Sequence, residues 1–165
     1  MSKDRIYALP RSRVGDFRFD NSVVDVFPDM IARSVPGYGS ILSMIEQLGA
    51  RYIRPNTNVY DLGCSLGAAT KLLRRQAPQS ATIHAVDNSS AMIEKLSEKL
   101  NASPPENQCN VEVHNADIRE LPMQNASLIV LNLTLQFVPA EQRSALLQNC
   151  CDALLSGGAL LLSEK

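Results

Sequence analysis

The sequence lacks an excess of charge of either sign. Sixteen lysines and arginines stand against seventeen aspartates and glutamates, which gives a net charge of -1 at neutral pH. Proteins that bind nucleic acids through their phosphates usually carry a clear basic excess. We therefore expect no direct contact with RNA or DNA.

Long hydrophobic runs are also missing. No stretch approaches the roughly 18 consecutive apolar residues that a membrane-spanning helix requires, and the polar start, Met1–Arg5, is not followed by the apolar segment of a secretory signal. We expect a soluble cytoplasmic protein that does not contact membranes.

Cysteines are few, and their spacing indicates no metal or redox chemistry. No Cys-x-x-Cys pair, the spacing typical of zinc binding and disulfide exchange, occurs among Cys64, Cys109, Cys150 and Cys151. Four cysteines in a chain of this length are too few for a disulfide scaffold. We expect reduced, buried thiols.

An alternation of strand-like and helix-like segments runs through most of the chain, without internal repeats. Strands are predicted over 58–63, 82–87, 110–115, 128–133 and 159–163. Apolar residues at helical spacing predict helices over 21–31, 41–48, 68–76, 90–100 and 140–155. Strands that alternate with helices form a parallel sheet with helices on both faces, so we expect a single α/β domain.

Prolines and glycines mark the expected ends of these elements. Pro28 must kink the first helix or lie in its first turn. A turn over 34–39 holds Tyr38 between two glycines, where its ring either covers a neighbouring cleft or packs on the core. Gly49 is expected to end the second helix, and Gly157 with Gly158 to end the last. The basic segment before residue 21 is interpreted as an N-terminal arm (1–20), and residues 21–165 as the domain.

Ligands of a parallel sheet bind beyond the carboxyl ends of its strands, so the residues that follow each strand are candidate ligand contacts. The first strand leads into Asp61–Gly67, whose glycines allow close approach of a ligand to the backbone and to a helix start. A tight strand-to-helix turn needs glycine with or without a ligand. The segment lacks the Gly-x-Gly-x-x-Gly fingerprint, which argues against a nicotinamide dinucleotide.

Polar residues follow the next three strands. Asp87 lies roughly 20 residues beyond the glycine loop, where a carboxylate can accept hydrogen bonds from ribose hydroxyls, but Asp87 or Asn88 could instead cap the next helix. Asp117 could accept from the exocyclic amine of adenine while the backbone N–H of Ile118 donates to a ring nitrogen. Alternatively, Asp117 could bond its own backbone. Asn132 places an amide near the crevice centre, or holds a loop.

Four blocks of sequence carry a more specific signal: Val26–Met30, Arg33–Tyr38, Val59–Thr70 and Asn132–Phe137. Together they resemble the carboxy-S-adenosylmethionine synthase family, which has the Rossmann-like fold of class I S-adenosylmethionine-dependent methyltransferases. The similarity extends over nearly the whole chain. It implies that S-adenosylmethionine is bound, without a metal, by Tyr38, Gly63, Cys64, Ser65, Asp87, Asn88, Asp117, Ile118 and Asn132.

The resemblance also implies a reaction. Members of this family use prephenate to convert S-adenosylmethionine into carboxy-S-adenosylmethionine and release phenylpyruvate, and a separate enzyme uses the product to modify the wobble uridine of tRNA. A homodimer with a closed, dry site is implied. No Ser-His-Asp triad or metal cluster is evident, and we interpret His84 and His114 as structural strand residues. A conventional methyltransferase and a non-catalytic nucleotide-binding module are the alternatives.

The chain departs from the family in length. Family members continue well past Lys165 and add the last strands of the sheet, part of the dimer contact and an arginine thought to engage a carboxylate. The resemblance therefore implies a C-terminally truncated domain, which we expect to retain the cofactor contacts but to have little carboxyl-transfer activity.

Overall fold

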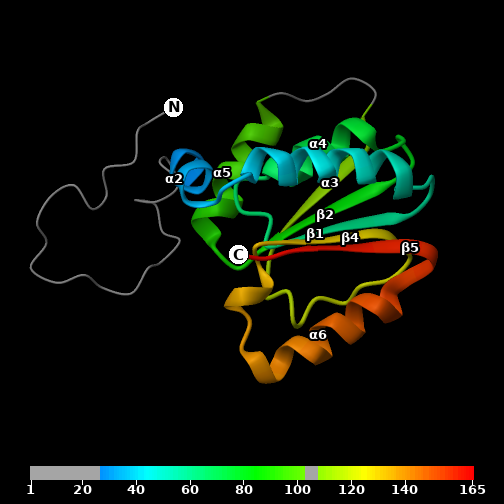
Figure 1. The fold of residues 1–165 in the computed structure, drawn as a ribbon. Coiled ribbons are helices and arrows are strands. Elements are labelled where there is room, and N and C mark those ends of the chain that lie inside the picture. Colours follow the sequence, from blue (N-terminus) through cyan, green and yellow to red (C-terminus); the bar gives the residue numbers. More distant parts are fainter. Residues whose placement is uncertain (1–26, 103–107) are drawn as a thin grey trace, which may run out of the picture.

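A computed structural model describes residues 27–102 and 108–165, which form one parallel five-stranded sheet with helices (Figure 1). The strands are β1 (Asn58–Leu62), β2 (Thr82–Asp87), β3 (Asn110–Asn115), β4 (Ala126–Asn132) and β5 (Leu154–Ser163). The helices are α2 (Phe27–Ser34), α3 (Tyr38–Tyr52), α4 (Ala68–Gln76), α5 (Ser90–Asn101) and α6 (Ala140–Ala153), with a 3-10 turn at Leu135–Phe137. The predicted α/β fold is confirmed. The predicted arm and the first residues of the predicted helix 21–31 lie outside the described residues.

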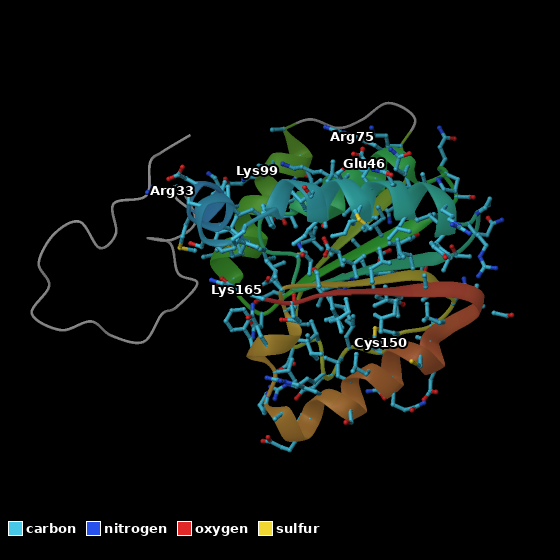
Figure 2. The ribbon with its side chains drawn as sticks, in the orientation of Figure 1. Arg33, Glu46, Arg75, Lys99, Cys150 and Lys165 are labelled. Carbon is cyan, nitrogen blue, oxygen red and sulfur yellow. The ribbon has the colours of Figure 1, made fainter. Side chains whose placement is uncertain are left out.

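The sheet is covered on both faces, as the alternation of elements predicts. Helices α3, α4 and α5 lie on one face, and α6 lies on the other (Figure 1). On the first face Leu73 of α4 packs against Val59 and Ile83 of the sheet. On the second, Leu146 and Cys150 of α6 pack against β4, and Figure 2 shows Cys150 on the helix.

The strand order β3-β2-β1-β4-β5 determines where a ligand can enter. The chain moves outward from β1 to β2 and β3, then returns to place β4 on the other side of β1, with all pairings parallel. The strand order therefore reverses between β1 and β4. A crevice opens beyond the carboxyl ends of the strands at such a point.

Helix α3 is longer at both ends than predicted. It begins at Tyr38, so the preceding turn is confined to residues 35–37, and it continues through Gly49 to Tyr52. A Cβ atom on Gly49 would lie 2.8 Å from the side chain of Leu73. The prediction that Gly49 ends the helix was wrong because this glycine permits close packing of α3 on α4. Pro28 lies in the first turn of α2, one of the two predicted positions.

The junction of α6 and β5 also differs from the prediction. The helix ends at Ala153, and Leu154 is already paired with Ala126 of β4. The glycines at 157 and 158 therefore lie in an irregularity of the strand, where Gly157 has a φ of 74°, and they do not end the helix. Cys64, Cys109 and Cys150 are buried as expected, but Cys151 is exposed because neighbouring residues point to different sides of a helix.

The connection from β3 to β4 contains no helix. Residues 116–125 descend from the carboxyl end of β3 to the start of β4 as turns and irregular chain. As a result, the part of the α6-side face nearest β3 has no helix of the described chain over it. No helix in the ranges 27–102 and 108–165 is long and apolar enough to cross a bilayer.

Candidate functional site

A cavity of about 810 Å³ lies beyond the carboxyl ends of the strands, within the range of about 300–1,000 Å³ that small-molecule sites occupy. Its wall comes from α2, the start of α3, the loop after β1 and the ends of β2, β3 and β4. It brings together every residue that the sequence predicts as a cofactor contact: Tyr38, Gly63, Cys64, Ser65, Asp87, Asn88, Asp117, Ile118 and Asn132. Their contact with a ligand stays a prediction.

The loop from Gly63 to Gly67 is bent by three residues with left-handed backbone. Gly63, Ser65 and Gly67 have φ values of 79°, 49° and 73°. A Cβ atom at Gly63 would overlap the side chain of Thr134, and one at Gly67 would overlap that of Leu96. The glycines are therefore required by both conformation and space. Ser65 adopts the same region despite its side chain, a form of strain that concentrates at functional sites.

Asp87 ties this loop to the end of β2. One carboxylate oxygen accepts from the backbone N–H of Ser65 and the other from that of Ser89, both at 2.9 Å. Ser89 is the N-cap of α5, with its hydroxyl accepting from the backbone N–H of Met92, so neither Asp87 nor Asn88 caps the helix. Each carboxylate oxygen has a second lone pair, which leaves Asp87 able to accept from a ligand hydroxyl.

A second carboxylate, Asp61, lies at the end of β1 and was not predicted as a site residue. It lines the cavity, and the Thr70 hydroxyl donates to it at 2.5 Å. Burial raises the pKa of Asp61 to about 6, and the charge of Asp87 adds to this effect. Burial also raises the pKa of Asp87. A charged side chain inside an apolar strand was the available signal, because such residues are rarely buried without a partner.

Neither acid has a basic partner in the structure. Across residues 27–102 and 108–165, no salt bridge involves Asp61 or Asp87. Buried carboxylates are normally compensated by a cation, because desolvation of the charge is costly. The cavity is therefore electrostatically suited to a ligand that carries positive charge.

Asp117 lies at the rim of the cavity and is held by its neighbour. The guanidinium of Arg119 donates to both carboxylate oxygens of Asp117, and the backbone N–H of Arg119 donates to Oδ1 at 2.9 Å. This side-chain pairing lowers the pKa of Asp117, so the group is ionised at neutral pH. Asp117 thus bonds nearby backbone, as one of its two predictions has it, and it also lines the cavity, while its contact with adenine stays a prediction.

Asn132 also lies at the cavity, but its side chain bonds a neighbouring strand rather than the loop that one prediction had it hold. It lines the cavity, while its side-chain oxygen accepts from the Ser163 hydroxyl at 2.6 Å and so links β4 to β5. Its amide N–H groups are the part that can donate to a ligand. The next residue, Leu133, has a φ of 60°, which is strained for a bulky side chain. Sequence reasoning had no signal for this strain.

Tyr38 and Cys64 complete the wall. Tyr38 is the first residue of α3 and lines the cavity, which fits the predicted covering role better than packing on the core alone. Burial raises the pKa of its hydroxyl, and the charge of Asp61 acts in the same direction. Burial also raises the pKa of Cys64, so this thiol stays protonated and is a poor nucleophile. The described lining is built for binding and orientation rather than for covalent catalysis.

Comparisons with known proteins agree with this architecture. Carboxy-S-adenosyl-L-methionine synthases from Aeromonas hydrophila and Vibrio atlanticus are 52% and 50% identical to the chain over 99% and 98% of its residues. The chain spans 66% of the length of each of these relatives.

Solved structures show the same fold at low sequence identity. A methyltransferase from Aquifex aeolicus superposes with a TM-score of 0.59 at 18% identity, over 80% of this chain and 67% of the other. Magnesium protoporphyrin IX methyltransferase from Synechocystis, with bound S-adenosylmethionine, gives 0.56 at 20% identity over 70% and 53%. A family model described as a methyltransferase domain matches residues 59–158. The chain therefore belongs to the methyltransferase domain family.

Proposed function

We propose that the cavity binds S-adenosylmethionine and that the protein uses prephenate to convert it into carboxy-S-adenosylmethionine. The observation that carries this proposal is the arrangement of two acids, the buried Asp61 and the part-buried Asp87, in one cavity with the other eight predicted contacts. The names of the relatives, which are half identical to the chain, favour this reaction over ordinary methyl transfer.

The chemistry of the wall fits the parts of this ligand. The sulfonium and the ammonium of S-adenosylmethionine are cationic, which offsets the desolvated charge of Asp61 and Asp87. Asp87 accepts from the ribose hydroxyls while it keeps its two bonds to the backbone. The carboxylate of Asp117 and the backbone N–H of Ile118 face the adenine, and Tyr38 covers the methionine part next to Asp61.

The reaction balances with the groups of the two substrates alone. Decarboxylation and loss of hydroxide convert prephenate to phenylpyruvate, hydroxide takes a proton from the sulfonium methyl to give water, and the resulting carbanion forms a carbon–carbon bond to the carbon dioxide. The protein must then hold the two substrates together and exclude bulk water. Phe27, Ile31 and Leu133 supply an apolar part of the cavity wall for that purpose.

The product would serve a separate enzyme as the donor for modification of wobble uridine in tRNA. In this scheme the protein meets only small molecules, S-adenosylmethionine and prephenate, and assembles as a homodimer in the cytoplasm. Its balanced charge of -1 is consistent with an enzyme that leaves tRNA binding to the later step.

The decisive experiment supplies S-adenosylmethionine and prephenate labelled with ¹³C in the carboxyl group that is lost. We expect a labelled carboxylated sulfonium by mass spectrometry, in amounts that depend on prephenate and that are small for the 165-residue chain. Asp87→Asn should reduce its formation, and the control Glu98→Gln, on the exposed side of α5, should not. Formation of S-adenosylhomocysteine without a need for prephenate would instead identify a conventional methyltransferase. Binding of S-adenosylmethionine without any turnover would identify a nucleotide-binding module.

A further inference from the structure

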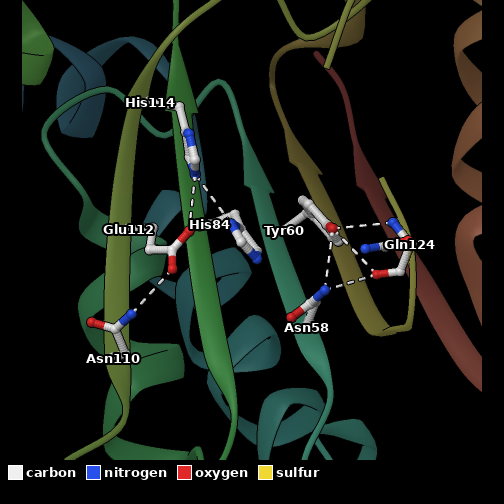
Figure 3. A network of polar contacts seen from close by, with 7 residues as sticks. All are labelled: Asn58, Tyr60, His84, Asn110, Glu112, His114 and Gln124. Atoms are coloured by element: carbon white, nitrogen blue, oxygen red, sulfur yellow. Dashed lines mark hydrogen bonds and ion pairs between the residues drawn. The ribbon is translucent and has the colours of Figure 1, made fainter. Parts of the chain in front are cut away.

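A second polar cluster lies on the sheet, away from the cavity. It consists of His84 on β2 with Glu112 and His114 on β3, and none of the three lines the cavity (Figure 3). Their side chains are on the face that carries α6, since His84 stacks on Tyr60 of that core. The connection over 116–125 forms no helix there, and the His84–Glu112–His114 cluster is partly open to solvent: the three side chains are 16%, 49% and 31% exposed.

The three side chains converge on one point. His84 Nδ1 lies 3.1 Å from His114 Nε2 and 3.3 Å from Glu112 Oε2, and the last two atoms are 3.8 Å apart. Ligand atoms bonded tetrahedrally to zinc at about 2.0–2.1 Å are separated by about 3.3–3.4 Å. The three separations approximate those of one face of a tetrahedron, and the longest of them, between His114 Nε2 and Glu112 Oε2, must shorten by a few tenths of an ångström when an ion binds.

Hydrogen bonding alone satisfies this arrangement poorly. A single N–H can lie between His84 Nδ1 and His114 Nε2, because one imidazole must donate and the other accept. While that N–H lies between the two rings, it is not directed at Glu112 Oε2, which faces both nitrogens. A bound cation would engage all three lone pairs at once.

Neighbouring side chains hold the three ligands in place. Asn110 donates to the other oxygen of Glu112, Oε1, at 3.3 Å, which leaves Oε2 to face the histidines. The ring of Tyr60 stacks on His84 with a centroid separation of 4.7 Å, and its hydroxyl is bonded to Gln124 (Figure 3). Such outer contacts orient the ligands of protein metal sites.

We propose that His84 Nδ1, His114 Nε2 and Glu112 Oε2 bind a divalent transition-metal ion, with zinc as the best fit. Two imidazoles and one carboxylate suit zinc and exclude magnesium and calcium, which require more oxygen ligands. Three protein ligands leave the fourth position for water. The ion joins β2 to the edge strand β3, whose ends lead to Asp87 and Asp117 of the cavity, so it acts as a clamp on the strands that support the adenosine side.

The register of β2 and β3 makes this site possible. His84 is directly opposite Glu112, and His114 is opposite Val86, one pleat further along the same face. The proposal differs from the sequence expectation that both histidines are structural and that no metal is bound. The same experiment decides between the two interpretations.

The test uses the 165-residue chain after treatment with a chelator and removal of that chelator. Zinc is titrated in competition with a chromophoric chelator, and Co²⁺ is added in parallel to record the visible absorption of a tetrahedral site. We expect one ion to bind per chain, with a dissociation constant in the micromolar range or below. His114→Gln and Glu112→Gln should each weaken binding by at least about tenfold, as loss of even an outer contact to a site does.

Two controls keep the result specific. Cys151→Ser removes the exposed thiol, the competing zinc ligand of the described chain, and should leave the affinity unchanged. Circular dichroism of the His114→Gln and Glu112→Gln chains should match the parent, since both residues are partly exposed. The proposal is overturned if zinc does not bind stoichiometrically, or if binding survives both substitutions. Loss of binding in Cys151→Ser would in that case assign the ion to this exposed thiol. Neither outcome depends on turnover, so failure here is distinct from failure of the proposed reaction.

Discussion

The acid-lined cavity and the His84–Glu112–His114 cluster each bring together several acceptor atoms that no Lys or Arg among residues 27–102 and 108–165 pairs with, but they differ in burial. Asp61 is 2% exposed and Asp87 is part-buried, and burial raises both pKa values. The cluster is half open to water, with Glu112 49% exposed. A ligand that brings positive charge into the cavity therefore relieves an unfavourable desolvation of its carboxylates. The cluster, which is partly hydrated, can bind an ion from solution with little change in the stability of the fold.

The two regions also differ in how they are built. Loops at the strand ends form the cavity, and left-handed residues such as Gly63 and Leu133 shape it. The cluster needs no unusual backbone, because pairing of β2 with β3 alone brings its side chains together. Substitutions should thus disturb the cavity through the backbone and the cluster only through its side-chain atoms.

The largest effect is expected for Gly63→Ala. The new Cβ would overlap Thr134 at a left-handed φ of 79°, and the sum of backbone strain and overpacking should cost about 2–5 kcal/mol. Gly157→Ala is the matched control, because its φ is 74° but nothing lies within 4 Å of the added atom. It should lose only about 1–2 kcal/mol. Urea denaturation of the two variants measures the difference, and equal losses would show that the loop tolerates the side chain.

The next effect is a pH dependence that originates at Asp61. Its pKa in the folded protein, about 6, lies above the ordinary 3.8, so the folded state holds the proton more tightly. The associated stabilisation is complete below about pH 4 and is lost as pH rises through 6; it amounts to about 3 kcal/mol. Asp61→Asn keeps an acceptor for Thr70 but does not ionise. Its free energy of unfolding should therefore fall less between pH 4 and 7 than that of the parent, and parallel curves would contradict the prediction.

Asp87→Ala is expected to weaken binding of S-adenosylmethionine by about 1–3 kcal/mol, since the ribose hydroxyls lose their acceptor. Calorimetry measures the affinity, and circular dichroism checks that the loop around Ser65 is not lost with its partner. Asp87→Asn retains one oxygen and should fall between the parent and the alanine variant. An unchanged affinity in a folded Asp87→Ala protein would show that Asp87 does not bind the ribose and only links the loop at Ser65 to β2.

Much of the fold could be predicted, because its signals are local. The helix over 68–76 and the strands over 82–87 and 110–115 match the structure residue for residue, since apolar periodicity and flanking polar residues delimit them. Errors arose where packing overrides a local signal. Gly49 continues a helix because α4 lies against it, and Leu154 leaves α6 because β4 pairs with it.

The candidate site was predictable to the extent that it follows strand ends. Asp87 and Asn132 each end a strand and Asp117 lies two residues past one, and the parallel sheet gathers such positions at one edge. The link of Arg119 to Asp117 and the strain at Leu133 depend on the loop conformation, which no periodicity encodes. The convergence of the two histidines depends on strand register, which a single sequence does not specify.

The smallest effect is expected for Glu112→Gln, which separates the two regions. In metal-free protein the change removes only part-exposed ion pairs, so the free energy of unfolding should move by no more than about 1 kcal/mol.

Asp61 and Glu112 are on opposite faces of the sheet and share no bonding partner. Asp61 bonds Thr70, while Glu112 contacts His84, His114 and Asn110. Effects at such independent sites add within about 0.5 kcal/mol. The change in the free energy of unfolding of the Asp61→Asn, Glu112→Gln double variant, measured in urea at pH 7, should therefore equal the sum of the changes in the two single variants. The affinity for S-adenosylmethionine should be unchanged by Glu112→Gln. A larger coupling energy would mean that the cluster and the cavity act as one unit through β2.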